Sequence, residues 1–201
     1  FASDEERKQK VAEAYFMRAV YYYNMVEQLG GVKLQMAPVD NVDIHPGKDS
    51  PMDIYEKCII PDLEFAAQWL PVEDRTTRPS KKSAMGMLAR ACLQSVEYDS
   101  SKKYVQRALE VAQEMINDCK AGGAALGVYM YDNVEDVFDE NNNFENKEAL
   151  WKHRYVAGGV SNQAWIMNQN NEQFYCPLTA FSAFQFKTDL HSGNKYDGLS
   201  D

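Results

Sequence analysis

The stretch of sequence that most constrains the fold is residues 13–29, which predict one long helix with two apolar faces. Apolar and tyrosine side chains recur there at alternating steps of four and three residues and so share one helical stripe: Tyr15, Ala19, Tyr22, Val26 and Leu29. A second stripe runs beside it: Phe16, Val20 and Tyr23. Because a helix at the rim of a domain needs only one apolar stripe, two stripes indicate a helix between two neighbours, as in a stacked helical array. The pair at residues 30–31, Gly-Gly, ends the helix, and at most one of the three tyrosines at residues 21–23 is expected to be exposed.

A second helix is predicted after a loop that contains two prolines. Ser50 is a favourable N-cap residue, and Pro51 suits the first helical position. The helix continues to about Leu70. Pro61 lies inside this pattern and lacks the N–H group that an α-helix needs, so a kink or local break is expected near Ile60.

Two further helices are expected, one over about residues 81–96 and one that is capped by residues 99–101 and reaches Asp118. They match the tetratricopeptide pattern loosely at Met85, Leu88, Ala89 and Cys92 in the first helix and at Ser101 and Val105 in the second. The long first helix and the second helix would form another pair beside them. The predicted fold class is therefore mainly α, an α–α superhelix of tetratricopeptide-like helical pairs with a loop-rich appended region.

The chain is expected to divide into two regions. Residues 1–126 form the tetratricopeptide-like helical region, and residues 127–201 form an irregular, incomplete, loop-rich region that packs on the helices. Neither helical nor strand periodicity persists in the second region. A short helix is expected there at residues 134–138, and residues 149–156 are expected to be a short strand or the end of a helix.

Composition and charge exclude several classes of protein. An apolar fraction of 45% excludes a mainly disordered chain, and a net charge of −9 argues against nucleic-acid binding, which requires a basic face. No apolar run approaches the length of a transmembrane span. The four cysteines contain no paired C-x-x-C spacing, so a zinc site is not expected. Cys58 and Cys92 lie on apolar helical faces and are expected to be buried free thiols, although the possible disulfide pairings among the four cysteines stay open.

The sequence predicts no catalytic residue, no cofactor and no metal site. Phosphate-binding glycine loops, His-Glu-x-x-His and Gly-x-Ser-x-Gly are all missing from the sequence. The three histidines are isolated from one another: His45, His153 and His191. Residues 139–145 alternate oxygen-bearing side chains as a calcium loop does, but Phe144 stands where the sharp turn needs glycine and Leu150 where a glutamate closes such a site.

A stretch rich in amides and aromatic residues is the better candidate for a functional site. Aromatic faces lie against the C–H side of a sugar ring, while amides and carboxylates bond its hydroxyl groups. The predicted ligand-binding residues are Asn162, Gln163, Trp165, Asn168 and Tyr175. The competing interpretation is that the aromatic residues of this stretch simply cover the helical region.

Four stretches resemble, in order, the motifs of SusD-like (RagB/SusD) proteins. Residues 13–23 and the following Gly-Gly-Val resemble the family's central helix, Glu-Ala-Tyr-Phe-x-Arg-Ala-x-x-Tyr-Tyr. Residues 59–70 resemble its Ile-x-x-Asp-Leu-x-x-Ala-x-x-x-Leu helix, and residues 84–93 its Ala-x-x-Leu-Leu-Ala-Arg-x-x-Leu helix. Residues 137–151 resemble its Leu-Phe … Asn-x-Glu-x-Ile-Trp segment. The resemblance covers roughly residues 10–155.

The resemblance implies a non-enzymatic protein that captures a glycan, or less often a peptide, at the cell surface. The implied partner is a TonB-dependent outer-membrane transporter of the SusC-like type, which such a protein covers like a lid. The resemblance also implies a surface-exposed outer-membrane lipoprotein that serves polysaccharide utilisation. Family members are longer, so we expect this chain to be an interior fragment that lacks the lipid anchor. The alternatives are a helical-repeat adapter that binds proteins in its groove and, less favoured, a glycoside hydrolase.

Overall fold

Helices dominate the part of the chain that the computed structural model describes, which comprises residues 3–38, 45–73, 78–139, 142 and 146–152. The helical elements are, in chain order, α1 (Asp4–Leu29), α2 (Pro51–Ile54), a π-helical turn (Tyr55–Ile59), α3 (Ile60–Trp69), α4 (Lys81–Gln94), a 3₁₀ turn (Ser95–Glu97), α5 (Val105–Lys120) and α6 (Val134–Phe138). This content confirms the mainly α fold class. No described helix is both long enough and apolar enough to cross a membrane.

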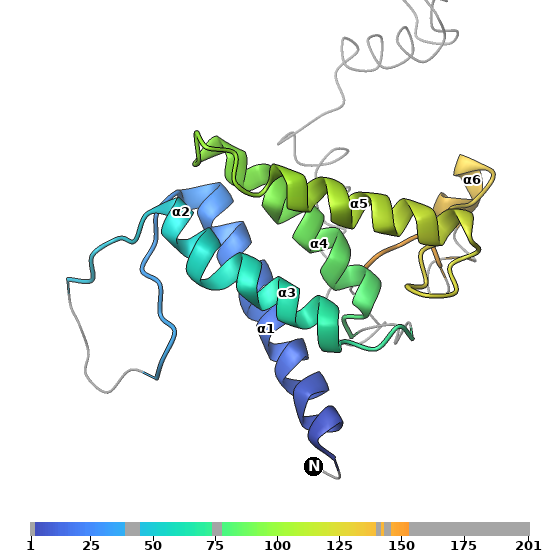
Figure 1. The fold of residues 1–201 in the computed structure, drawn as a ribbon, viewed down its shortest axis with the longest axis horizontal. Helices are drawn as coiled ribbons and strands as arrows, with labels where there is room; N and C mark the ends of the chain where they lie inside the picture. Colours follow the sequence, from blue (N-terminus) through green and yellow to red (C-terminus); the bar gives the residue numbers. More distant parts are fainter. Residues whose placement is uncertain (1–2, 39–44, 74–77, 140–141, 143–145, 153–201) are drawn as a thin grey trace, which may run out of the picture. The chain divides into compact units, whose positions relative to one another are not determined.

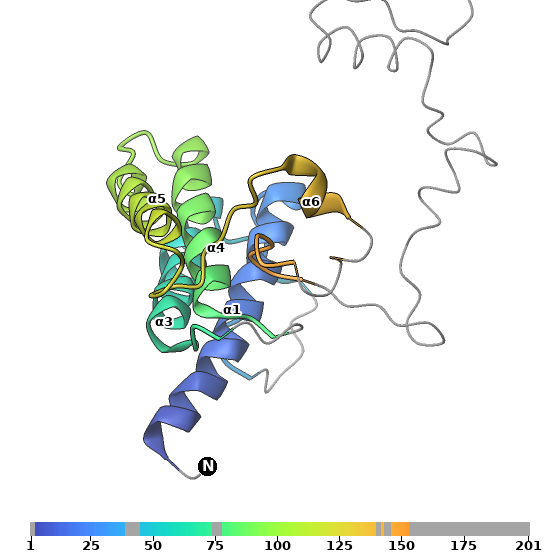
Figure 2. The same ribbon diagram turned by 90° about the vertical axis from the view of Figure 1, so that its right-hand side faces the viewer.

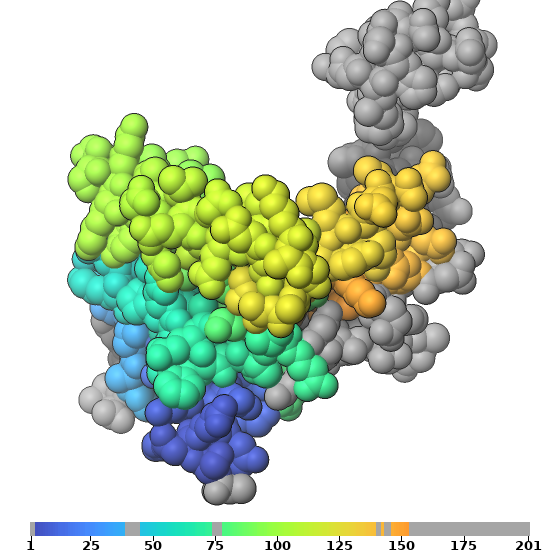
Figure 3. Space-filling view, turned by 45° about the vertical axis from the view of Figure 1, so that its right-hand side comes forward, coloured from blue at the N-terminus to red at the C-terminus, as the bar shows by residue number. Residues whose placement is uncertain are grey.

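The longer helices stack in the order in which they occur in the chain. α1 packs on α3, α3 packs on α4, and α4 packs on α5. Each helix runs roughly antiparallel to the one before it (Figure 1), and the turned view shows the same succession (Figure 2). In the space-filling view, α3 and α5 lie next to one another on one face of the molecule (Figure 3). The stack therefore consists of helical pairs, as the sequence predicts.

α1 begins at Asp4, before the motif at residues 13–29, because Ser3 serves as its N-cap. The hydroxyl of Ser3 accepts a hydrogen bond from the Glu6 N–H at 3.1 Å, and the first turn is acidic, which suits the positive end of the helix dipole. Gly30 ends the helix with a φ of 72°, and its N–H donates to the Val26 carbonyl at 2.8 Å.

Two sides of α1 are covered, as its two stripes predict. The first stripe faces α3, where the Tyr15 ring lies beside Phe65 with ring centroids 5.2 Å apart. On the second stripe, Phe16 meets Trp151 at 5.2 Å in a T-shaped contact. The second neighbour is therefore partly an irregular segment and not a helix. Tyr21 is the exposed tyrosine of the three, as expected.

The prediction is wrong for one residue of the first stripe. Leu29 is 65% exposed. It occupies the last position of α1, where no described element covers it. The other members of the stripe are buried or half-buried.

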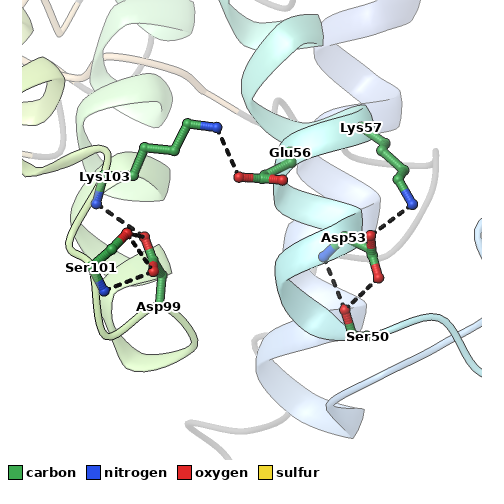
Figure 4. Close-up of polar contacts among 7 residues, drawn as sticks. All are labelled: Ser50, Asp53, Glu56, Lys57, Asp99, Ser101 and Lys103. Carbon is green, nitrogen blue, oxygen red and sulfur yellow. Dashed lines mark hydrogen bonds and ion pairs between the residues drawn. The ribbon is translucent and has the colours of Figure 1, made fainter.

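The predicted start of the second helix is confirmed (Figure 4). The Ser50 hydroxyl accepts from the Asp53 N–H at 3.1 Å and donates to the Asp53 carboxylate at 2.7 Å, while Lys57 pairs with the same carboxylate at 2.6 Å. The predicted break near Ile60 is also confirmed, in the form of the π-helical turn. Since Pro61 has no N–H to donate, the Ile60 N–H bonds to the carbonyl of Tyr55, five residues back.

The predicted cap of the fourth helix is wrong in position. The Asp99 carboxylate does accept from the backbone N–H groups of Ser101 at 2.8 Å and Lys103 at 3.0 Å, but these bonds close a turn and do not start a helix (Figure 4). Lys102 has a φ of 55°, which a right-handed helix cannot contain. α5 therefore begins only at Val105, and it extends to Lys120, slightly beyond the predicted Asp118.

Three cysteines are described, and all three are free thiols. Cys58 and Cys92 are buried, as predicted, and Cys119 is half-buried. The fourth cysteine, Cys176, lies outside the described residues.

Beyond α5, the short helix predicted at residues 134–138 is confirmed as α6. The expectation of a strand or helix end is wrong for residues 149–152, which have neither structure. Their backbone groups bond instead to side chains, as described next.

Candidate functional site

The five predicted ligand-binding residues, Asn162, Gln163, Trp165, Asn168 and Tyr175, all lie outside the described residues, so their role stays a prediction. Within the described part of the chain, aromatic residues and side-chain amides also occur close together in sequence, in residues 129–148. We call this region the Tyr129–Phe138 surface. Its side chains are Tyr129, Tyr131, Asn133, Phe138, Asn142 and Lys147.

The aromatic rings of the Tyr129–Phe138 surface are open to solvent. Phe138 is 81% exposed and Tyr129 is 42% exposed. α6, which carries Phe138, has no buried residue. Single exposed apolar side chains are common, but large exposed aromatic rings that gather in one segment are typical of binding surfaces.

Tyr131 holds the tyrosine side of the surface in place. Its ring meets the Tyr129 ring in a T-shaped contact at 4.9 Å. Its hydroxyl donates to the Asn142 side chain at 3.2 Å and accepts from the Lys147 N–H at 3.1 Å. Its own N–H donates to the Glu148 carboxylate at 2.9 Å. Tyr131 is therefore held by a polar network, and its ring supports the ring of Tyr129.

Asn142 links this network to α6. Its amide nitrogen donates to the Asp136 carbonyl at 2.7 Å. Asn133, at the N-terminus of α6, donates to the Asp136 carboxylate at 3.3 Å. The short helix that carries Phe138 is thus attached to the tyrosine side of the surface by side-chain amides.

Asn146 is the centre of the supporting segment and is buried. Its amide nitrogen donates to the Val137 carbonyl at 2.8 Å. Its amide oxygen accepts from the N–H groups of Glu148 at 3.0 Å and Ala149 at 3.2 Å. One side chain therefore replaces the backbone partners that residues 146–149 would otherwise have in a helix or strand.

The supporting segment is fastened to the helical stack. Lys82 of α4 donates to the Lys147 carbonyl at 2.9 Å, and the Ser83 hydroxyl donates to the Leu150 carbonyl at 2.5 Å. Leu150 lies against Gly86, where a Cβ atom would come within 2.5 Å of Leu150 Cδ1. The missing side chain at Gly86 is what allows the segment to approach α4 so closely.

The chemistry of the Tyr129–Phe138 surface suits a neutral polyhydroxylated ligand. Its rings offer apolar faces, and the Lys147 amine lies 5.9 Å from the centroid of the Tyr129 ring, which places a hydrogen-bond donor beside an apolar face. Within the residues described, no group of three or more His, Cys, Asp or Glu side chains could hold a metal ion. Most of the calcium-like spacing at residues 139–145 lies outside those residues.

The sequence analysis missed this surface, although a signal was present. Tyrosines at 129 and 131, phenylalanine at 138 and asparagines at 133, 142 and 146 combine the same residue types as the predicted stretch at 162–175. From the sequence, a short helix is the one feature expected at residues 134–138. Which of these side chains would be exposed, and which would be structural, could not be read from their order.

Comparison with known proteins finds that the chain is similar to SusD-like proteins. Residues 2–93 match a family model described as "Starch-binding associating with outer membrane". SusD-like protein P2 of Formosa agariphila is 29% identical over 167 residues, which cover 81% of this chain and 31% of that protein. A SusD-like protein of Bacteroides ovatus is 28% identical over 207 residues, covering 99% of this chain and 34% of that protein. The chain thus spans about a third of the length of the curated relatives it matches.

A solved structure that is described as containing a xylogluco-oligosaccharide has the same fold. It superposes with a TM-score of 0.61 at 27% identity, over 77% of this chain and 30% of that chain. The likeness confirms the predicted tetratricopeptide-like helical fold.

Proposed function

The chain belongs to the SusD-like family, and on that premise we propose that it captures a glycan at the cell surface without cleaving it. The captured glycan passes to a TonB-dependent outer-membrane transporter of the SusC-like type. Proteins of this family are carbohydrate-binding and associate with the outer membrane. The surface location, the lipid anchor and the transporter partner are parts of the same proposal.

The observation that supports glycan capture is the Tyr129–Phe138 surface. Two aromatic rings are exposed there, and the amides around them are held by hydrogen bonds to backbone and side chains. Preorganised rings and amides can hold a sugar without first paying for their own ordering. Glu148 is engaged by the Tyr131 N–H, so it serves the scaffold of this surface and is not a free catalytic acid. Capture therefore rests on shape and hydroxyl pairing, with no covalent step.

Isothermal titration of the chain against a panel of oligosaccharides tests this proposal. The panel contains xylogluco-oligosaccharides, malto-oligosaccharides and a set of unrelated glycans, and the same mixtures are assayed for new reducing ends. We expect binding to at least one glycan and no reducing ends. Cleavage would favour a glycoside hydrolase, and no binding to any glycan would favour the adapter alternative.

The predicted stretch at residues 162–175 is tested in parallel. If Trp165 contacts the glycan, Trp165→Ala weakens binding; if that ring only covers the helices, the same change lowers stability and leaves the affinity unchanged. For the transporter, co-purification with a TonB-dependent outer-membrane transporter from cells that produce both proteins is the direct measurement. Failure to co-purify would remove delivery from the proposal but not capture.

A further inference from the structure

Negative charge is concentrated in the segment that carries the Tyr129–Phe138 surface. Residues 129–148 contain seven aspartate and glutamate residues but a single lysine and no arginine. Their excess of six negative charges is two thirds of the net charge of −9 for the whole chain, although the segment is about a tenth of its length. The charge is therefore a local feature of this surface and not a general property of the chain.

Three of these carboxylates are exposed close to the rings. Asp132, Glu135 and Asp136 are exposed, and among the residues that the structure describes none of the three forms an ion pair. The Asp136 carboxylate accepts from the neutral amide of Asn133, which leaves its charge in place. Glu135 and Asp136 precede Phe138 on α6, where the rise is about 1.5 Å per residue. Because exposed charges act over a Debye length of about 8–10 Å, these carboxylates reach a ligand held at the ring.

A fourth carboxylate lies behind the tyrosine side of the surface. Glu148 is half-buried and accepts from the Tyr131 N–H at 2.9 Å, and the Tyr131 ring lies against the ring of Tyr129. Within the described part of the chain, Glu148 forms no ion pair either. The cation of the segment, Lys147, places its amine 5.9 Å from the centroid of the Tyr129 ring. A single ammonium group is therefore outnumbered by the carboxylates around it.

The side-chain amides around the rings already donate to the protein. Asn133 and Asn142 both donate to Asp136, the first to its carboxylate at 3.3 Å and the second to its carbonyl at 2.7 Å. Asn146 donates to the Val137 carbonyl at 2.8 Å. An anionic group needs donors, because an ionised carboxylate can only accept hydrogen bonds. A sugar hydroxyl both donates and accepts, so it can bond to carboxylate and amide oxygens.

We propose that the Tyr129–Phe138 surface selects its glycan by charge: it holds neutral or amine-bearing sugars and rejects sugars that carry carboxylate or sulfate groups. This inference rests on the proposed function, because it concerns the charge of the glycan that the surface holds. Repulsion by the local carboxylates and the prior engagement of the amide donors both act against an anionic sugar. A polyuronate, with a carboxylate on every sugar, is rejected most strongly.

Matched forms of one glycan test the inference by isothermal titration of the full chain. Each glucose-containing oligosaccharide of the panel is used with its primary hydroxyl groups retained, oxidised to carboxylates, converted to carboxamides or replaced by amines. At about 50 mM salt we expect the carboxylate form to bind about tenfold more weakly than the native form, and the amine form about threefold more tightly. The carboxamide has the shape of the carboxylate without its charge and should bind like the native form. At about 0.5 M salt, screening should reduce the carboxylate penalty to about threefold.

Two pairs of substitutions locate the effect on the protein. Asp132→Asn with Glu135→Gln removes two exposed charges close to the rings and should reduce the carboxylate penalty by about threefold. Glu5→Gln with Glu97→Gln is the matched control. It removes the same charge from exposed positions on α1 and after α4, outside the Tyr129–Phe138 surface, and should leave the penalty unchanged.

The possible results separate this inference from the proposed function. A carboxylate form that binds as tightly as the native or the carboxamide form would overturn the inference and leave glycan capture in place. An equal reduction of the penalty by both pairs of substitutions would also overturn it, because the net charge of the chain would then be responsible. If no form of any glycan binds, the proposed function fails and the inference fails with it.

Discussion

Arg18 of α1 and Asp62 of α3 form a bidentate ion pair between these two helices. Arg18 Nε lies 2.6 Å from one carboxylate oxygen of Asp62, and Nη2 lies 2.7 Å from the other. The Asp62 side chain is only 5% exposed, and the pair raises the pKa of the Arg18 guanidinium further above its ordinary value. The pair joins the Arg of the first family motif to the Asp of the second.

Asp62→Ala is expected to lower the free energy of unfolding by about 3 kcal/mol, because it leaves the partly buried Arg18 cation without a partner. The double change of Arg18→Met with Asp62→Leu should recover most of that loss, since an aliphatic pair fills the same space. Urea denaturation followed by circular dichroism measures both. The control is Asp53→Ala, which removes the exposed pair with Lys57 and should cost much less, because solvent screens that pair. Equal losses from Asp62→Ala and Asp53→Ala would contradict this account.

Asp118 near the end of α5 gives the stability a dependence on acid pH. Burial by itself raises the pKa of its carboxyl, but backbone N–H groups, with those of Val128 at 3.1 Å and Ala125 at 2.8 Å among them, outweigh burial and lower the pKa below its ordinary value. A carboxyl whose pKa is lower in the folded chain than in the unfolded chain stabilises the fold at any pH above its unfolded-state pKa. This contribution is lost as the pH falls through the folded-state pKa.

Asp118→Asn should therefore reduce stability by about 1.5–3 kcal/mol at neutral pH. The difference between the parent chain and the variant should shrink as the pH falls below about 4. Denaturation series at several pH values give this difference directly. A difference that stays constant down to the acid limit would show that the carboxylate charge is not what matters.

Asn146 should control the order of the segment behind the Tyr129–Phe138 surface. Asn146→Ala removes the acceptor of the Glu148 and Ala149 N–H groups, so hydrogen exchange at both amides should become faster. Asn146→Asp keeps that acceptor but loses the donor to the Val137 carbonyl, so those two amides should stay protected. Hydrogen exchange by NMR distinguishes the two variants. Equal protection in both would mean that packing, and not this side chain, orders the segment.

The thiols should differ in reactivity according to their burial. Burial raises the pKa of Cys58 to about 12 and that of Cys92 to about 12, so the reactive thiolate is scarce at neutral pH. Cys119 is half-buried and should be alkylated first among these three. Iodoacetamide labelling of the folded chain, read by peptide mass spectrometry, checks the order. In urea the three should react at similar rates, which serves as the control.

Removing an exposed ring of the Tyr129–Phe138 surface should weaken glycan binding. We expect Tyr129→Ala and Phe138→Ala each to lower the affinity by about threefold to tenfold, the range for loss of one aromatic contact. Tyr21→Ala is the matched control, because Tyr21 is 59% exposed on α1 and lies outside this surface. Titration calorimetry with the glycan identified in the panel gives the affinities. If Tyr21→Ala weakened binding as much as Tyr129→Ala, the site would have to be placed elsewhere.

All four family motifs meet on α1 in the folded chain. Besides Arg18 and Asp62, Arg90 of the third motif donates to the Tyr23 hydroxyl at 3.1 Å. Trp151 of the fourth motif packs on Phe16. The family resemblance rests on the order of the four motifs in the sequence. The contacts between the motifs are visible only in the structure.

The sequence by itself determined where most helices begin and end and that the fold is mainly α. The Ser50 cap, the break before Pro61 and the stop after Leu29 depend on groups within a few residues of one another, so local chemistry is enough to predict them. The start of α5 could not be predicted in the same way. Lys102 adopts a left-handed conformation there, and Lys103 reaches across to Glu56 at 2.9 Å, a contact between segments far apart in the chain (Figure 4).

Only the tertiary structure decided which apolar or polar side chains have a structural role and which are free to bind. Periodicity marks Phe16 as buried, but it cannot show that an irregular segment ending in Trp151 covers it. Composition makes the asparagines of residues 133–146 look alike, yet Asn146 is a buried support, whereas Asn133 is exposed at the surface. The physical reason is that burial and hydrogen-bond partners depend on contacts between distant segments, which neither local propensity nor residue order encodes.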